Sequence, residues 1–148
     1  MIAIAHAAAD DPAVAVLLDE LSDTLEAITG SSGRASFDPA DVQAEGACLL
    51  VAEIDGNAVG CGAIRPLARD VGEIKRMYAR PGTRGVGAAL LAALENEARS
   101  MGYRETWLET REVNTRAVAF YIRHGYRRIE NFGKYAGRAE AVCFAKTL

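Results

Sequence analysis

A short run of small residues has the composition and the position of an anion-binding loop. It spans residues 84–91, reads RGVGAALL, follows a strand-like stretch at 73–78 and opens an amphipathic helix. Small residues let backbone N–H groups close on an anionic oxygen, and the free N–H groups and positive dipole end of the helix favour negative charge there. The order of strand, loop and helix therefore predicts a phosphate-binding site.

Two common phosphate loops do not fit this run. A P-loop ends in Gly-Lys-Ser/Thr, whereas Gly87 is followed by two alanines, which offer neither a lysine for the phosphates nor a hydroxyl for magnesium. A dinucleotide-binding loop that starts at Gly85 would place Leu90 where close helix packing needs glycine or alanine. The pattern that remains is Arg-x-x-Gly-x-Ala, from Arg84 to Ala89.

A second set of residues lies on a helix predicted further along the chain. Asn114 stands at its start, Tyr121 follows two helical turns later, and Gly125 ends it. Taken singly, Asn114 is typical of an N-cap and Tyr121 of a core aromatic residue. Together with the glycine loop, in this order and at these intervals, they favour a ligand-binding function.

The two sets together resemble the GNAT superfamily of N-acyltransferases, which bind acyl-coenzyme A, and the resemblance covers residues 72–129. It implies an α/β fold, the GNAT fold, with a mixed, mostly antiparallel, twisted sheet that carries helices on both faces. Two central strands of that sheet splay apart, and the pantetheine arm of the cofactor enters the gap. Here these strands would be residues 73–79 and 105–110.

The resemblance also implies which residues hold the cofactor, acetyl-CoA. Backbone groups at the end of the first splayed strand would pair with the pantetheine amides, and the glycine loop would hold the pyrophosphate. The helix that starts at Asn114 would line the cofactor arm. The cofactor-binding residues implied are Met77, Tyr78, Ala79, Arg84, Gly85, Val86, Gly87, Ala88, Ala89, Asn114, Ala117 and Phe120.

Transfer of an acyl group to an amine needs an acid and a base, because the thiolate must gain a proton and the amine must lose one. The resemblance makes Tyr121 the general acid. Glu73 is the first candidate for the base. The alternative interpretation of Glu73 is a surface carboxylate that pairs with Lys75 or Arg76. Glu109, at the end of the next strand, is the reserve candidate.

The residues around the acceptor are less well defined. Arg111 follows the second splayed strand where small relatives tend to carry glycine, so a cation could border the acceptor pocket and bind a carboxylate. Phe132 and Tyr135 resemble residues that wall the acceptor site in a group of small bacterial-type members. The loop at residues 30–37 could form part of a substrate lid, and the acceptor itself stays open.

These residues predict an N-acetyltransferase that moves an acetyl group from acetyl-CoA to a primary amine of a small molecule or amino acid by direct attack on the thioester. Two alternatives remain: a non-catalytic acyl-CoA-binding sensor, and a protein N-terminal or lysine acetyltransferase. The predicted partner is a small-molecule amine acceptor, and the resemblance implies a homodimer. No cluster of residues predicts a metal site, and His6 and His124 are expected to be structural.

Composition agrees with one enzyme domain over residues 1–148. Half of the residues are hydrophobic and a quarter are charged, and the formal net charge of −3 argues against a general nucleic-acid binder. Cys48, Cys61 and Cys143 form an odd set in apolar stretches and are expected to be reduced core residues. The sequence starts without a signal-peptide pattern and has no run of membrane-spanning length, which predicts a cytoplasmic protein with no membrane partner.

Hydrophobic periodicity and turn residues predict the elements that position these groups. A first helix begins at Asp11-Pro12 and ends at Gly30, and a short helix follows Pro39. An apolar strand at 48–54 forms a hairpin, expected at the centre of the sheet, with a strand at 58–64. The remaining expected elements are a strand at 71–78, a helix ended by Gly102, a strand at 105–110, a helix at 114–124 and strands at 126–129 and 140–146.

Overall fold

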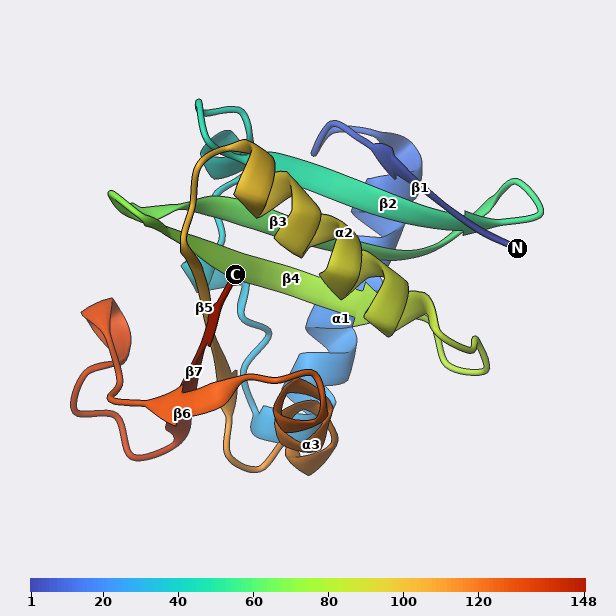
Figure 1. Cartoon of the computed structure of the whole chain (residues 1–148). Helices are drawn as coiled ribbons and strands as arrows, with labels where there is room; N and C mark the ends of the chain where they lie inside the picture. Colours follow the sequence, from blue (N-terminus) through green and yellow to red (C-terminus); the bar gives the residue numbers. More distant parts are fainter.

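A computed structural model describes all 148 residues and shows strands and helices in nearly the expected order (Figure 1). Three α-helices and three short 3₁₀ helices accompany one sheet of seven strands. The elements are β1 (Ile2–His6), α1 (Pro12–Thr29), η1 (Arg34–Ser36), η2 (Pro39–Val42), β2 (Cys48–Ile54), β3 (Asn57–Ala68), β4 (Val71–Ala79), α2 (Val86–Ser100), β5 (Glu105–Arg111), α3 (Thr115–Arg123), β6 (Arg127–Ile129), η3 (Gly133–Tyr135) and β7 (Ala141–Thr147).

The strands lie in the order β1-β2-β3-β4-β5-β7-β6. Every neighbouring pair is antiparallel except β4 and β5, which run parallel. The expectation that the β2-β3 hairpin forms the centre of the sheet is wrong, because β4 occupies the middle position. The hairpin is displaced because β1 adds only one strand beyond it, whereas three strands lie beyond β4.

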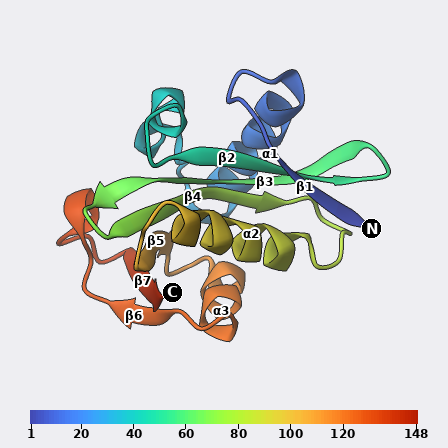
Figure 2. The same cartoon turned by 45° about the horizontal axis from the view of Figure 1, so that its top comes forward.

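Helices cover both faces of this sheet, as predicted (Figure 2). Helix α1 packs Val14 and Leu17 against one face of β2 and β3, and α2 packs its leucines against the opposite face. Successive side chains of β2 therefore enter different clusters, Leu49 in the first and Leu50 in the second. This burial on both faces explains why the strand is apolar almost throughout its length.

One strand was not expected, and another extends well beyond its expected end. Strand β1 was not expected, because only Ile2 and Ile4 are large apolar residues in it, and its order comes from pairing with β2 along its whole length. Strand β3 continues past Pro66 to Ala68, where the register with β4 shifts. A proline fits there because the irregular pairing does not need the missing N–H group.

The start of α2 lies unusually close to β3. A Cβ atom added at Gly60 would lie 2.6 Å from Val86 Cγ1 and 2.8 Å from the Tyr78 carbonyl oxygen, so only glycine allows this approach.

The three cysteines are free and buried, as expected. Burial raises the pKa of the Cys48 thiol to about 11 and that of the Cys61 thiol to about 12, so both stay protonated at neutral pH.

A buried polar network ties α2 to the C-terminal strands. The Glu95 side chain, on the inner face of α2, accepts hydrogen bonds from the Tyr126 hydroxyl at 3.0 Å and from Lys146 Nζ at 3.1 Å. The Tyr126 hydroxyl also lies 2.7 Å from Thr106 Oγ1 in β5. The Glu95 carboxylate thereby links α2 to β7 directly, and to the start of β6 and to β5 through Tyr126.

Removal of this carboxylate should destabilise the fold. In Glu95→Ala the Tyr126 hydroxyl and the Lys146 ammonium lose their acceptor, and an unsatisfied buried donor costs about 1–3 kcal/mol. We expect urea unfolding to report a loss of that size. Glu97→Ala, on the same helix, removes a partner of the exposed His6 side chain, and we expect a loss below about 1 kcal/mol. Equal losses in the two variants would contradict the role of the network.

Candidate functional site

The sheet opens between its two parallel strands. β4 and β5 pair only over three positions, from Val71 opposite Glu105 to Glu73 opposite Trp107. Beyond Glu73 the β5-facing edge of β4 has no strand beside it, while the other edge stays paired with β3 as far as Ala79. The predicted splay is confirmed, and it leaves backbone N–H and C=O groups of β4 free along one edge.

A groove of about 690 Å³ runs from this opening over the glycine loop and along α3, and we call it the long groove. It collects most of the residues that the sequence predicted to hold a cofactor. The predicted residues that line it are Met77, Tyr78, Ala79, Gly85, Val86, Gly87, Ala88, Asn114, Ala117 and Phe120, and Tyr121 also lines it. Arg84 is exposed and Ala89 is half-buried, and neither is among the lining residues.

The glycine loop presents the start of α2 to the long groove. Gly85 caps the helix with φ 74°, a left-handed conformation that suits glycine, and no side chain caps the helix. The first intrahelical bond is donated by the Ala89 amide to the Gly85 carbonyl, so the amides of Val86, Gly87 and Ala88 donate to no group of the chain. Three free N–H groups at a helix start make this part of the groove suited to an anion.

Helix α3 forms the opposite wall. The Asn114 side-chain oxygen accepts a hydrogen bond from the Ala117 amide at 3.3 Å, so this residue is the helix N-cap, and its side-chain NH₂ group remains available to a ligand. The Phe120 ring lies against Gly87, 3.4 Å from where a Cβ would be, and also contacts the His124 ring. These contacts fix the width of the groove between α2 and α3.

Tyr121 lies at the inner end of the long groove. Its ring packs against those of Phe120, Tyr126 and Phe144, and only 8% of the residue is exposed. Burial alone raises the pKa of its hydroxyl, with no contribution from a hydrogen-bonding partner. The hydroxyl therefore stays protonated at neutral pH and has its proton free to donate.

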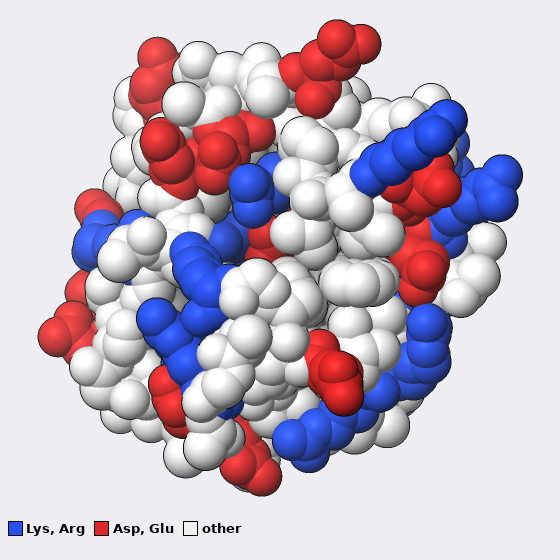
Figure 3. All heavy atoms as spheres, turned by 90° about the vertical axis from the view of Figure 1, so that its left-hand side faces the viewer, with Lys and Arg blue, Asp and Glu red and all other residues white.

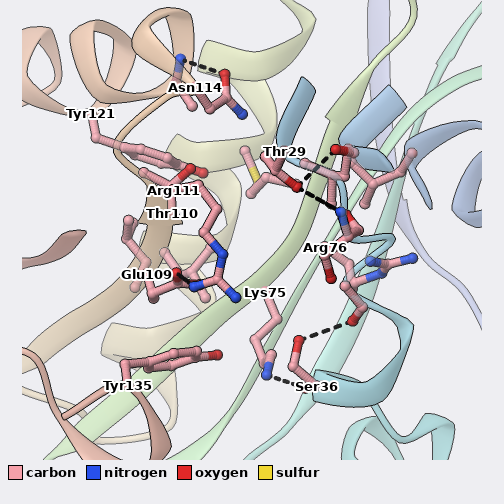
Figure 4. A pocket seen from close by; sticks show the side chains of 18 of the residues that line it. Thr29, Ser36, Lys75, Arg76, Glu109, Thr110, Arg111, Asn114, Tyr121 and Tyr135 are labelled. Carbon is pink, nitrogen blue, oxygen red and sulfur yellow. Dashed lines mark hydrogen bonds and ion pairs between the residues drawn. The ribbon is translucent and has the colours of Figure 1, made fainter. Parts of the chain in front are cut away.

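A second, smaller cavity of about 150 Å³ adjoins the long groove, and we call it the small cavity (Figure 4). It is lined by residues 73–77 of β4, residues 108–111 of β5, Tyr135 and the segment that follows α1. The residues that line both spaces are Leu21, Leu25, Met77, Asn114, Ala117 and Tyr121. The two spaces thus meet at the Tyr121 side chain.

Glu73 lies on the wall of the small cavity but is held by a partner that was not expected. Its Oε1 atom is 2.8 Å from Arg65 Nη1, on the neighbouring strand β3, and the residue is only 3% exposed. Arg65 in turn lies 3.5 Å from Asp41. The alternative interpretation, a surface carboxylate paired with Lys75 or Arg76, is therefore wrong, because Glu73 is buried and is the direct cross-strand neighbour of Arg65.

Glu109 and Arg111 occupy the β5 side of the small cavity as an ion pair, with Glu109 Oε2 2.6 Å from Arg111 Nη1. Burial raises the pKa of the Glu109 carboxyl, and the attraction of Arg111 offsets this only in part. Arg111, which the sequence predicted beside the acceptor, lines this cavity. Tyr135 also lines it, whereas Phe132 packs against the Trp107 and Tyr135 rings and is not among the lining residues.

Lys75 and Arg76 join the cavity to the segment at residues 30–37. Lys75 Nζ donates to the Ser36 carbonyl, and Arg76 donates to the Ser32 and Leu18 carbonyls and the Ser22 hydroxyl. Arg76 has φ 55°, at a register shift between β3 and β4, which turns its side chain toward α1. Ser31, Gly33 and Ser36 line the cavity, so the predicted lid segment forms one of its walls.

Sequence reasoning missed three cations beside the long groove. Arg116 and Arg123 line it from α3, seven residues and so two helical turns apart, and Arg80 lines it from the end of β4. Arg80 is engaged with Glu20 of α1 through two hydrogen bonds of 2.9 and 2.8 Å. The spacing of Arg116 and Arg123 was a usable signal, because residues seven apart lie on the same face of a helix.

The sequence model of the acetyltransferase (GNAT) family matches residues 14–126. The chain belongs to this family. Among curated proteins, this GNAT member is 33% identical over 132 residues to the uncharacterized N-acetyltransferase YjgM of Escherichia coli, covering 82% of the chain and 78% of YjgM. It is 39% identical over 90 residues to an IAA acetyltransferase of Azospirillum brasilense, a match that spans 59% of each protein.

Solved structures agree with this assignment. An acyl-CoA N-acyltransferase structure from Klebsiella pneumoniae has a TM-score of 0.84 and 30% identity, covering the whole chain and 98% of that protein. PaiA N-acetyltransferase from Thermoplasma acidophilum, solved in complex with coenzyme A, shares the fold at 17% identity with a TM-score of 0.76, covering 100% of the chain and 99% of PaiA. The protein is therefore an enzyme of the GNAT acyl-CoA N-acyltransferase class.

The surface carries no field of a single sign on the face shown in Figure 3, where acidic and basic side chains are interspersed. A hollow near the middle of this face contains charged atoms of both signs.

None of the helices combines the length and the apolar composition needed to cross a membrane.

Proposed function

We propose that this GNAT enzyme transfers an acetyl group from acetyl-CoA to the primary amine of a small molecule by direct attack on the thioester. The observation that carries the proposal is the meeting of the long groove and the small cavity at Tyr121. A donor in the groove and an acceptor in the cavity would react at that junction. The small size of the cavity favours a small acceptor over a folded protein surface.

The residues of the long groove fit coenzyme A. The free amides of Val86, Gly87 and Ala88 suit a pyrophosphate, and the open edge of β4 suits the pantetheine amides as a missing strand would. Arg116 and Arg123 add positive charge for phosphates along α3. Acetyl-CoA, when bound, supplies an activated acyl carbon.

In the transfer, the neutral amine nitrogen forms a bond to the thioester carbonyl carbon and the carbon–sulfur bond breaks. The proton lost by the amine passes to a base, and the departing thiolate gains a proton from Tyr121 or accepts its hydrogen bond. Burial raises the pKa of the Tyr121 hydroxyl, so this group keeps its proton and can donate a hydrogen bond to the thiolate as the carbon–sulfur bond breaks.

Two carboxylates compete for the role of the base. Glu73 was the first candidate, but Arg65 engages it and only 3% of the residue is exposed. Glu109 also has an arginine partner, yet burial raises its pKa, which makes it a stronger base for an ammonium at neutral pH. We therefore propose Glu109 as the base, acting directly or through water.

The homodimer and the cytoplasmic location stay predictions.

The pyrophosphate site can be tested at Gly87, which lines the long groove without a positive φ. In Gly87→Ala the new methyl group would meet Phe120 at an ordinary 3.4 Å, so the helix should be unchanged or more stable by about 0.5–1 kcal/mol. We expect calorimetry to show coenzyme A binding weakened by roughly tenfold, because the methyl group occupies the groove floor. Ser100→Ala, at the far end of α2, should leave binding unchanged, and equal affinities in all three proteins would refute the site.

Tyr121→Phe tests the reaction itself. The variant keeps the ring and its packing but loses the proton donor, so we expect kcat for thiol release from acetyl-CoA to fall by about 10²-fold while the Kd for coenzyme A changes little. Loss of both, or of neither, would contradict the role of Tyr121. A wild-type protein that binds acetyl-CoA but releases no thiol with any amine or peptide would instead be a sensor, and activity confined to peptides would indicate a protein acetyltransferase.

Glu109→Gln tests the base. At neutral pH we expect kcat/KM to fall by about 10²- to 10⁴-fold, and the loss to shrink as the pH approaches the pKa of the acceptor amine, since an amine that is already neutral needs no base. Glu112→Gln, at an exposed position just beyond β5, is the control and should match the wild type. If Glu73→Gln shows this pH-dependent loss and Glu109→Gln does not, Glu73 is the base.

A further inference from the structure

The charged residues of the small cavity do not balance one another. Five of them line it: Glu73, Lys75, Arg76, Glu109 and Arg111. Both carboxylates are already paired with arginines, at 2.8 and 2.6 Å. No carboxylate lies within ion-pair distance of Lys75 or Arg76, so the wall has a surplus of positive charge.

Lys75 has hydrogen-bond donors that no group of the chain accepts. It is half-buried and donates to a single acceptor, the Ser36 carbonyl, although an ammonium group carries three N–H donors. Burial lowers its pKa, because desolvation outweighs the attraction of Glu73. A desolvated cation without a counter-ion costs free energy, which a bound anion would recover.

The other two cations, Arg76 and Arg111, differ in how many of their hydrogen-bond donors face the cavity unused. Arg76 donates from both Nη atoms to Leu18, Ser22 and Ser32, and so holds α1 and the following segment against β4, while its Nε–H group is buried without a partner. Arg111 donates one of its five N–H groups to Glu109 and has others to offer. Because the Arg76 guanidinium is turned toward α1, Lys75 and Arg111 are the pair that can receive an anion in the cavity.

Figure 4 shows how these groups lie. Tyr121 is at one end of the cavity and Tyr135 at the other, and the side chains of Lys75, Glu109 and Arg111 enter the space between them. The Tyr135 hydroxyl faces the same space from η3. A ligand with a positive group toward Tyr121 and Glu109 and a negative group toward Lys75 would match this order.

We infer that the acceptor is a primary amine that also carries a carboxylate, the chemistry of a small amino acid, with the carboxylate held by Lys75 and Arg111; this inference rests on the proposed function. The cavity volume of about 150 Å³ agrees with a molecule of this size, since a cavity of that volume holds roughly one benzene molecule. A second ammonium group, as in diamines and polyamines, would face Lys75 and Arg111 and be repelled.

The test compares acceptors that differ only in the carboxylate. Thiol release from acetyl-CoA is measured with a panel of small amino acids and with the amide of each, and calorimetry measures binding of the same compounds to the protein loaded with coenzyme A. For the wild type we expect kcat/KM to favour the best amino acid over its amide by about 10- to 100-fold. Lys75→Met should abolish this preference by raising KM for the amino acid, with the amide affected little.

Two further variants keep the result interpretable. Lys134→Met makes the same charge change at an exposed lysine beside Tyr135 and should retain the preference. Lys75→Arg keeps the cation and should restore much of it, and thermal unfolding confirms that each variant is folded. Amides or diamines used as well as amino acids by the wild type, or equal losses on both acceptors in Lys75→Met, would overturn the inference but leave the proposed function standing. No turnover of any amine would overturn both.

Discussion

The separation of β4 from β5 after three paired positions is the constraint on which the rest of the site depends. A parallel pair that stayed in register to Ala79 would satisfy the edge of β4 and close the space that both cavities occupy. β5 instead pairs with β7 along its whole length, and β4 pairs with β3 from Val71 to Ala79 except at the register shift around Arg76. Each strand is thus stabilised from its outer side, which lets the inner sides part without either strand unravelling.

The opening is kept by packing on both sides of it. Helix α2 approaches β3 over Gly60, and Phe120 of α3 rests on Gly87, so contacts at glycine set the two walls of the long groove. On the opposite face, Glu20 of α1 accepts from Tyr78 and Arg80 at the end of β4, and Arg76 ties the middle of that strand to the same helix. The free edge of β4 is therefore part of a rigid strand.

Most of this architecture could be read from the sequence because its signals are local. The caps at Asp11 and Gly30, the periodic apolar residues of the helices and the glycine loop act within a few residues of one another, and every one of these elements was predicted. Strand β1 was missed because its order comes from a partner nearly fifty residues away. The partner of Glu73 was misjudged for the same reason: Arg65 becomes its neighbour only through the β3-β4 register.

The two spaces share residues of α1, β4 and α3, but each also has segments of its own. The end of β4 and the start of α2 line only the long groove, whereas the segment after α1, the end of β5 and η3 line only the small cavity. Substitutions in the latter segments can reshape one compartment while the other is conserved. After gene duplication, such a division of labour would let a copy evolve toward a new metabolite without rebuilding the machinery that activates the group it transfers.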